Sequence, residues 1–190
     1  MQHSINTPLK ESDLLKLSVG DLVLLTGKIY TARDAAHKKL KELIEKGDFD
    51  LFELNGAVIY YCGPTPAPPG RVIGSAGPTT SYRMDPYVPL LLSKGVKGFI
   101  GKGKRSIEVK VSLSKFKGIY FIATGGAGAL LSTKVKSSKL IAFPDLGPEA
   151  IYELEVENFP LIVGIDFEGN DIYEIGPEEA RKLISQANTL

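Results

Sequence analysis

Hydrophobic residues occur along the chain in short runs that end at glycine or proline. The runs DLVLLTG (21–27) and NGAVIYYCG (55–63) predict strands, the first ending in a turn at Thr26-Gly27. Three further strands are predicted in VKGFIGKG (96–103), GIYFIATGG (118–126) and KLIAF (139–143).

Between the first two strands, the segment TARDAAHKKLKELIEKGD (31–48) has apolar residues at helical spacing. We expect this helix to end at Gly47, because glycine is the usual residue after a helix. Thr31 is the predicted N-cap, with Asp34 three residues on in the capping-box position.

The middle of the chain contains a proline-rich segment, PTPAPPG (64–70), which we expect to be a loop because proline lacks the N–H that a central strand needs. A second helix is predicted to begin near Thr80 or at the Asp-Pro pair of 85–86, where proline suits the first turn. It should continue through VPLLLSKG (88–95) and end at Gly95.

The last third of the chain predicts a helix in AGALLSTKVKSS (127–138), strands in 149–176 with a hairpin turn at Gly169-Asn170, and a final helix in 178–187. Helices and strands alternate in the middle, whereas both ends are rich in strands. This order favours a single α/β domain over residues 1–190, with a mixed sheet and flanking helices.

Composition narrows the class of protein. Of 190 residues, 43% are hydrophobic, which is enough for a core, and the net charge of +1 gives no overall attraction to nucleic acid or to acidic membranes. A lone cysteine, Cys62, excludes an internal disulfide and supplies too few thiolates for a self-contained zinc or iron–sulfur site. No apolar run reaches the roughly 20 residues of a membrane span, and no leader is visible, so we expect a cytoplasmic protein.

Arg33 is unusual because it lies at a helix start, where the helix dipole disfavours a cation. One interpretation is that Arg33 is solvated or pairs with Asp34. The other is an anion site, in which the guanidinium and backbone N–H groups converge on one carboxylate. His37, one helical turn later, is either an ordinary polar residue or a candidate acid or base.

Two further turns also place a cation beside glycine or a helix start. Arg83 follows Gly77-Pro-Thr79-Thr80 near the predicted start of the second helix, and the segment GKGKRS (101–106) places Lys102 between two glycines. Any one of these turns would ordinarily be a solvated loop. Three together favour a pocket for a small polyanion, most simply a dicarboxylate. The segment GGAGAL (125–130) lacks the last glycine of a dinucleotide motif, so it predicts a tight strand-to-helix turn, with close packing or an anion at the helix start as the alternative.

These segments, taken together, resemble the β subunit of the class I, iron–sulfur-dependent fumarate hydratases and of the related L(+)-tartrate dehydratases. The resemblance rests on five segments in family order: TGKIYTARDAAHKKL, IGSAGPTTSYRMDPYV, IGKGKRS, ATGGAGAL and NFPLIVGIDFEGN. It implies a hydro-lyase with a swivelling β/β/α domain. It also implies that a [4Fe–4S] cluster is held by three cysteines of a partner α subunit, whose iron acts as a Lewis acid on the substrate hydroxyl. The assembly implied is α2β2.

The resemblance also assigns roles to residues. Arg33 and Arg83 correspond to the carboxylate-binding arginines of the family, and Lys102 to the lysine that neutralises the same charge. Thr79 corresponds to a threonine that contacts the substrate and takes part in proton transfer, and His37 to a proton carrier or a support for Arg33. Such cations suit a dehydration that builds negative charge beside a carboxylate.

In the same motif, Gly77 and Thr80 are expected to lie against the substrate. Tyr82 replaces a residue that is small in many fumarases, and Lys104 replaces an asparagine; both could change the fit of the substrate.

Three functions remain open from the sequence. The KRS ending of segment 101–106 favours fumarate and (S)-malate as substrates, with tartrate or a methyl-substituted dicarboxylate as the alternative. A different kind of function is a non-catalytic module that binds a carboxylate metabolite and regulates a partner.

Overall fold

The computed structural model describes residues 1–187, and over this range seven strands form one sheet in the order β1-β2-β3-β4-β5-β7-β6. The strands are β1 (Gln2–Asn6), β2 (Leu22–Thr31), β3 (Val58–Tyr60), β4 (Gly98–Gly101), β5 (Ile119–Ile122), β6 (Val135–Ala142) and β7 (Ile151–Ile165). The single-domain prediction extends to residue 190, so its last three residues lie outside the described part.

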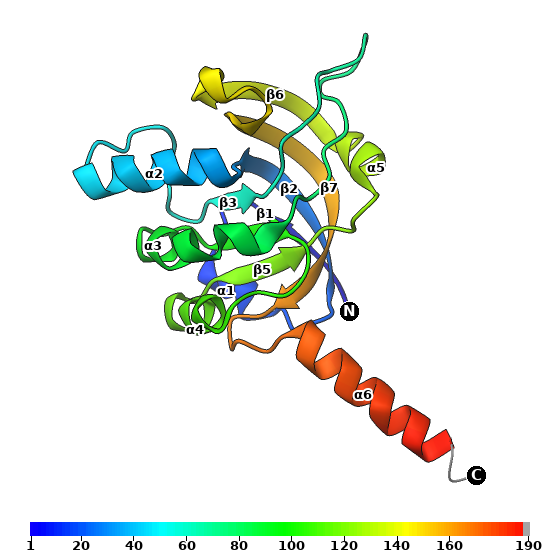
Figure 1. The fold of residues 1–190 in the computed structure, drawn as a ribbon. Helices are drawn as coiled ribbons and strands as arrows, with labels where there is room; N and C mark the ends of the chain where they lie inside the picture. Colours follow the sequence, from blue (N-terminus) through cyan, green and yellow to red (C-terminus); the bar gives the residue numbers. More distant parts are fainter. Residues whose placement is uncertain (188–190) are drawn as a thin grey trace.

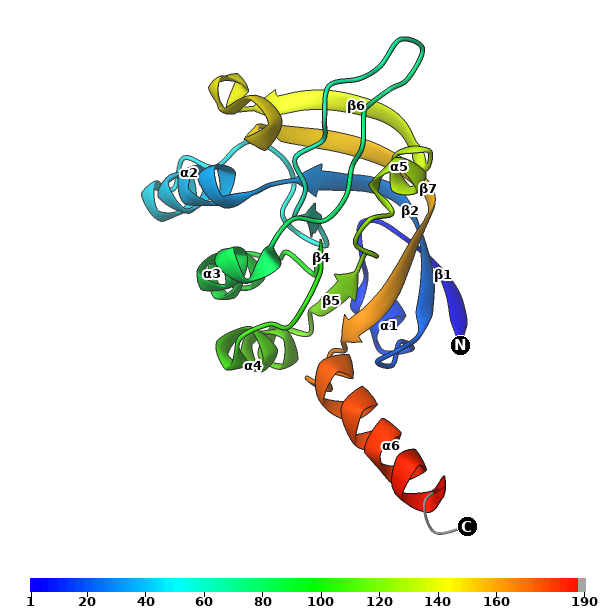
Figure 2. The same cartoon turned by 45° about the vertical axis from the view of Figure 1, so that its right-hand side comes forward.

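Helices α2, α3 and α4 lie side by side along the sheet (Figure 1). The α-helices are α1 (Glu11–Leu14), α2 (Asp34–Lys46), α3 (Val88–Ser93), α4 (Ile107–Phe116), α5 (Gly128–Ser132) and α6 (Ile172–Ala187). Two 3-10 helices are η1 (Ser81–Tyr87) and η2 (Pro144–Glu149). Figure 2 shows that α6 projects away from the body of the domain. None of the helices within residues 1–187 combines the length and the apolar character needed to cross a membrane.

The strand pairings close most of the sheet on itself. β2 pairs with β3, β3 with β4 and β4 with β5, all in parallel. β7 then pairs antiparallel with both β5 and β2, which completes a ring of five strands. The sheet is therefore mixed, as the sequence predicts, and the α/β class is confirmed.

Alternation along the strands divides the core in two. On β3 and its extension, Val58, Tyr60 and Cys62 belong to one buried cluster, to which all seven strands contribute. Ile59 and Tyr61 belong to a second cluster, beneath α2, α3 and α4. Each short parallel strand is thus buried on both faces, which explains its uninterrupted apolar sequence.

Two local predictions near β2 are wrong. Thr26-Gly27 is not a turn, because β2 continues to Thr31 and the register with β7 shifts between Leu25 and Gly27, as in a β-bulge. The positive φ of Gly27, +112°, serves this bulge. Thr31 is not the N-cap of α2: it is the last residue of β2, and its hydroxyl donates to the Ala150 carbonyl at 3.3 Å and accepts from the Tyr152 amide at 3.0 Å.

The end of α2 is confirmed at Gly47, which has a left-handed conformation (φ 78°). The helix predicted over 127–138 is too long, because α5 ends at Ser132 and the remainder joins β6. The strands predicted over 149–176 form the single strand β7 followed by the start of α6, although Ile165 and Asp171 do form a bridge across the predicted turn.

This topology places several loops at one edge. The carboxyl ends of parallel strands lie at the same edge of a sheet, and here β2, β3, β4 and β5 are parallel neighbours. Such an edge is the usual place for ligands, both in open α/β sheets and in closed α/β barrels. Arg33, Gly63, Lys102 and Thr124 each follow one of these strands within a few residues.

Candidate functional site

Arg33 is the N-cap residue of α2 and has an extended backbone (φ −115°, ψ −165°). Its Nη2 lies 3.4 Å from Oε1 of Glu149, the last residue of η2. The other oxygen of the same carboxylate, Oε2, accepts a hydrogen bond from the Ala35 amide at 3.2 Å. A guanidinium and a helix N-terminus thus converge on one carboxylate, and that carboxylate belongs to the chain itself.

His37 lies inside the protein, with no exposed surface. Its Nδ1 is 2.9 Å from the Arg33 carbonyl oxygen. A carbonyl can only accept, so Nδ1 carries the hydrogen and Nε2 is the atom with the lone pair. Burial lowers the pKa of His37 to about 4, against the opposing effects of this hydrogen bond and of the Asp34 charge. His37 is therefore neutral at pH 7 and is bonded to the backbone of Arg33.

Arg83 lies on η1 and reaches across to α2. Its Nε is 3.1 Å from Oδ1 of Asp34, and the Arg83 side chain is 41% exposed, so it remains accessible. Its Nη2 donates to the Thr79 hydroxyl at 3.5 Å. The Asp34 carboxylate is therefore the link between the two arginine segments, in place of the capping role predicted for it.

Thr79 is held by its backbone. Its amide donates to the Tyr61 carbonyl at 2.8 Å, which fixes the loop against the extension of β3. Because the hydroxyl accepts from Arg83, its own hydrogen is free to be donated elsewhere. Thr80 is exposed and precedes η1, where its side chain makes no capping hydrogen bond.

Lys102 directly follows β4 and has an exposed side chain. Its amide donates to the Ser81 hydroxyl at 2.9 Å. A methyl group added to Gly125, in the turn after β5, would lie 3.9 Å from Lys102 Cδ. The lysine stem therefore lies next to the β5 turn, at the same edge as the other candidate residues.

Gly77 packs against the start of α5. A methyl group added to Gly128 would lie 2.8 Å from the Gly77 nitrogen and 2.4 Å from the Ser75 hydroxyl. The Ala76 amide also donates to the Gly128 carbonyl at 3.1 Å. This contact accounts for Gly128, whereas Gly126 has open space around it and a positive φ of 82°, as in a tight turn.

Arg105 is turned inward. Its side chain is 2% exposed and its Nη1 donates to Asp85 Oδ1 at 2.7 Å. Asp85 Oδ2 accepts from the Ser106 amide at 2.8 Å. Burial raises the pKa of Asp85 more than the Arg105 charge and the Ser106 hydrogen bond lower it. Arg105 therefore stabilises the loop after β4, and Lys102 and Lys104 are its accessible cations.

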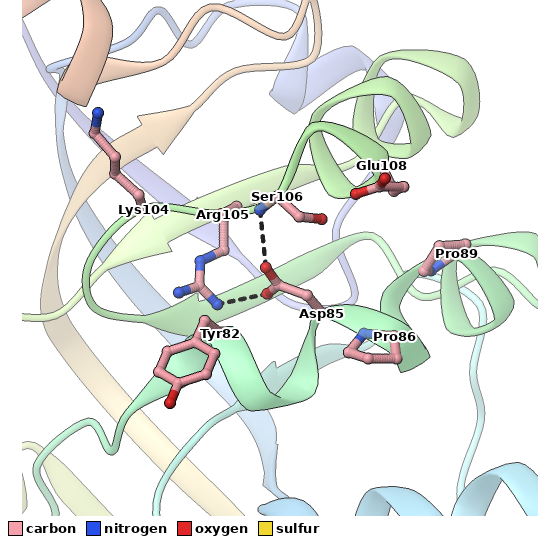
Figure 3. Close-up of a pocket in the computed structure, with 8 residues that line it drawn as sticks. All are labelled: Tyr82, Asp85, Pro86, Pro89, Lys104, Arg105, Ser106 and Glu108. Atoms are coloured by element: carbon pink, nitrogen blue, oxygen red, sulfur yellow. Dashed lines mark hydrogen bonds and ion pairs between the residues drawn. The ribbon is translucent and has the colours of Figure 1, made fainter.

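A cavity of about 630 Å³ lies beside the carboxyl edge, between η1 and the start of α4 (Figure 3). Its walls are formed by Tyr82, Asp85, Pro86, Pro89, Lys104, Arg105, Ser106 and Glu108. The cavity walls do not include the candidate residues Arg33, Arg83, Thr79 and Lys102. The cavity and these candidate residues are therefore neighbouring features rather than one site.

The chain does not fit an iron–sulfur cluster. Cys62 is wholly buried in the core, and burial raises the pKa of its thiol to about 12, which disfavours the thiolate that binds iron. In the described residues, no group of three or more His, Cys, Asp or Glu side chains could hold a metal ion.

Two residues of the site, Glu149 and Ser81, were not predicted from the sequence. Glu149 is 114 residues from Ala35, with which it bonds, and nothing local in the sequence connects them. Ser81 lies within the segment Thr-Thr-Ser-Tyr-Arg (79–83), which was a signal in the sequence. Its burial, with 1% of its surface exposed, is visible only in the structure.

Comparison with known proteins identifies the family of the chain. Residues 2–176 match the family model described as the fumarase C-terminus. The chain is 41% identical to the anaerobic class I fumarate hydratase of Escherichia coli strain K12 over 90% of its own length and 32% of that protein. It is also 41% identical, over 100% of its length, to a provisionally named L(+)-tartrate dehydratase subunit beta of Methanocaldococcus jannaschii, covering 98% of that protein. Fumarate hydratase 2 of Leishmania major is 41% identical over 84% of the chain, which spans 28% of the relative.

Proposed function

Because the chain belongs to the fumarase C-terminus family, we propose that it is the β subunit of a two-subunit hydro-lyase that interconverts (S)-malate and fumarate. The chain spans about a third of the fumarate hydratases that it matches, but nearly all of the tartrate dehydratase β subunit. This difference supports a separate partner chain, an α subunit, that supplies the remaining two-thirds. We propose that this α subunit carries the [4Fe–4S] cluster on three cysteines, in an α2β2 assembly in the cytoplasm.

The observation that carries the proposal is the convergence of Arg33, Arg83 and Thr79 at one edge of the sheet. Asp34 joins the two arginine segments at 3.1 Å, and Thr79 lies 3.5 Å from Arg83. Each guanidinium group can bind one carboxylate, so the two arginines together suit a small ligand with two carboxylates.

In this proposal, Arg33 and Arg83 bind and orient the dicarboxylate, and Lys102 offsets the negative charge that develops when the proton beside a carboxylate leaves. Gly77 and Thr80 border the same ligand. The bound cluster would supply the Lewis acid for the hydroxyl group. This chain supplies the orienting cations and the Thr79 hydroxyl.

Thr79 is proposed to hold or move the proton, with Lys102 or an acid of the partner as its activating neighbour, because a free hydroxyl is a weak base near neutral pH. For His37, complete burial and the hydrogen bond to the Arg33 carbonyl favour support of Arg33 over proton transfer. His37 is thus proposed as a positioning residue.

A second candidate substrate is L(+)-tartrate, because the full-length relative is named as a subunit of its dehydratase. Tyr82 and Lys104 are exposed and lie next to the carboxyl edge of the sheet, where they would discriminate between malate and tartrate. Both substrates are 2-hydroxydicarboxylates, so the same pair of arginines, Arg33 and Arg83, can bind either.

The test is anaerobic reconstitution of the chain with its α subunit and with iron and sulfide, followed by separate assays on L-malate, L-tartrate and D-malate. Malate turnover that requires both chains supports the proposal, and preferential tartrate turnover supports the second candidate. A stable complex with an intact cluster that turns over none of them favours a non-catalytic carboxylate-binding module.

The variant Arg83→Lys tests, within the same assay, whether Arg83 binds a substrate carboxylate. Lysine keeps the charge but cannot make a two-point contact, so kcat/KM should fall about ten- to a hundredfold. Arg181→Lys, an exposed arginine on α6, is the matched control and should leave turnover unchanged. Undiminished turnover in Arg83→Lys would show that Arg83 does not bind a substrate carboxylate.

A further inference from the structure

One buried hydroxyl connects two of the candidate segments. Ser81 is 1% exposed and begins η1. Its Oγ donates to the Thr79 carbonyl at 2.9 Å and accepts from the Lys102 amide at 2.9 Å. Thr79 lies in the loop that follows β3, whereas Lys102 follows β4, so this hydroxyl joins loops from two neighbouring strands.

The Lys102 peptide is also held from its other side. Arg105 Nη2 donates to the Lys102 carbonyl at 3.4 Å. The guanidinium is fixed in turn by Asp85, which also accepts from the Ser106 amide (Figure 3). The amide and the carbonyl of the same residue therefore both bond to side chains that are almost completely buried.

The Ser81 hydroxyl occupies space next to Gly101. A methyl group added to Gly101 would lie 2.5 Å from Ser81 Oγ and 2.8 Å from the Tyr120 hydroxyl. Gly101 thus leaves the room in which the serine hydroxyl can meet the Lys102 amide. Serine suits this position because its hydroxyl both donates and accepts on a one-carbon stem.

We propose that Ser81 is a positioning residue that sets the separation of Thr79 and Lys102 through these two hydrogen bonds. This inference rests on the proposed function, since it concerns the two residues assigned to proton transfer and charge neutralisation. Without the Ser81 hydroxyl, the partly buried Lys102 amide loses its partner, and the loop after β4 shifts relative to Thr79.

The structural half of the inference is tested on the full chain without any substrate. Amide hydrogen exchange followed by NMR should show the Lys102 amide exchanging at least about tenfold faster in Ser81→Ala, because the bond that protects it is gone. Amides of strand β5 should be unchanged. Ser112→Ala is the matched control, a similarly buried serine on α4 that makes neither of these bonds.

The catalytic half is tested in the reconstituted complex. Ser81→Ala should lower kcat for malate about a hundredfold, the usual effect of a small misplacement of reacting groups, while KM changes less than about threefold. Ser112→Ala should retain the wild-type kcat. A merely structural role would instead lower the urea midpoint and the amount of active complex without changing kcat per active site.

Two results would overturn the inference: a Lys102 amide that exchanges at the wild-type rate in Ser81→Ala, or full kcat in that variant despite faster exchange. A wild-type complex that turns over no dicarboxylate would overturn the proposed function itself and with it the catalytic half. The exchange measurement would still decide whether Ser81 holds Lys102.

Discussion

Protonation of His37 should destabilise the fold as the pH falls. The folded protein holds this imidazole fully buried with a pKa of about 4, whereas the ordinary value is 6.5. Between these two values the unfolded chain binds the proton and the folded chain does not. Stability therefore falls as the pH drops below 6.5 and levels off below about 4.

The size of the effect follows from the two pKa values. A difference of about 2.5 between them corresponds to about 3 kcal/mol of unfolding free energy in full, and to about 2.5 kcal/mol by pH 4.5. Complete burial of the ring means that solvent does not screen the effect. This is a large part of the roughly 5–15 kcal/mol that stabilises a typical domain.

The measurement is urea unfolding, followed by far-UV circular dichroism, from pH 7.5 to pH 4.5. His37→Asn is the informative variant, because its amide keeps a donor near the Arg33 carbonyl and does not titrate. We expect the wild type to lose about 2.5 kcal/mol more than His37→Asn over this range.

His3→Asn is the matched control, since His3 is the other histidine of the chain. Between pH 7.5 and pH 4.5, this variant should lose as much unfolding free energy as the wild type. If wild type and His37→Asn lose the same free energy, burial does not hold His37 neutral and the reasoning fails.

Three further predictions concern the ion pair, the hydroxyl and the metal. Asp85→Asn leaves the Arg105 charge buried without its partner, so urea unfolding should show a loss of about 3–5 kcal/mol; a loss below about 1 kcal/mol would contradict the buried pairing. Thr79→Ser should retain more activity in the reconstituted complex than Thr79→Ala, and equal rates would show that the hydroxyl takes no part. The chain purified alone should contain no stoichiometric iron or sulfide by elemental analysis, and finding both would place a cluster here.

Local patterns were sufficient for the elements whose physics is local. The end of α2 followed from Gly47, and β3, β4 and β5 followed from short apolar runs that are buried on both faces. Helix α4 was missed because Ile107 and Val111 on it are 74% and 61% exposed, so its apolar residues do not form the usual buried stripe.

Other features depended on distant partners. Glycine marks both a turn and a bulge, and only the pairing of β2 with β7 shows that Gly27 belongs to a bulge. The same holds for Thr31, whose hydroxyl is used by Ala150 and Tyr152 instead of the helix start. At the candidate site, the sequence indicated the cations but gave no sign of Glu149.

The carboxylates beside the arginines have a thermodynamic consequence. Arg33, Arg83 and Lys102 bring three positive charges to the edge, while Glu149 and Asp34 bring two negative charges within 3.4 Å of the guanidinium groups. A dianion is therefore only partly neutralised by this chain and should bind it weakly. Strong binding needs another positive group, which in the proposed complex would come from the α subunit. By linkage, the ligand would then strengthen the association of the two subunits by the same factor as their association strengthens its binding.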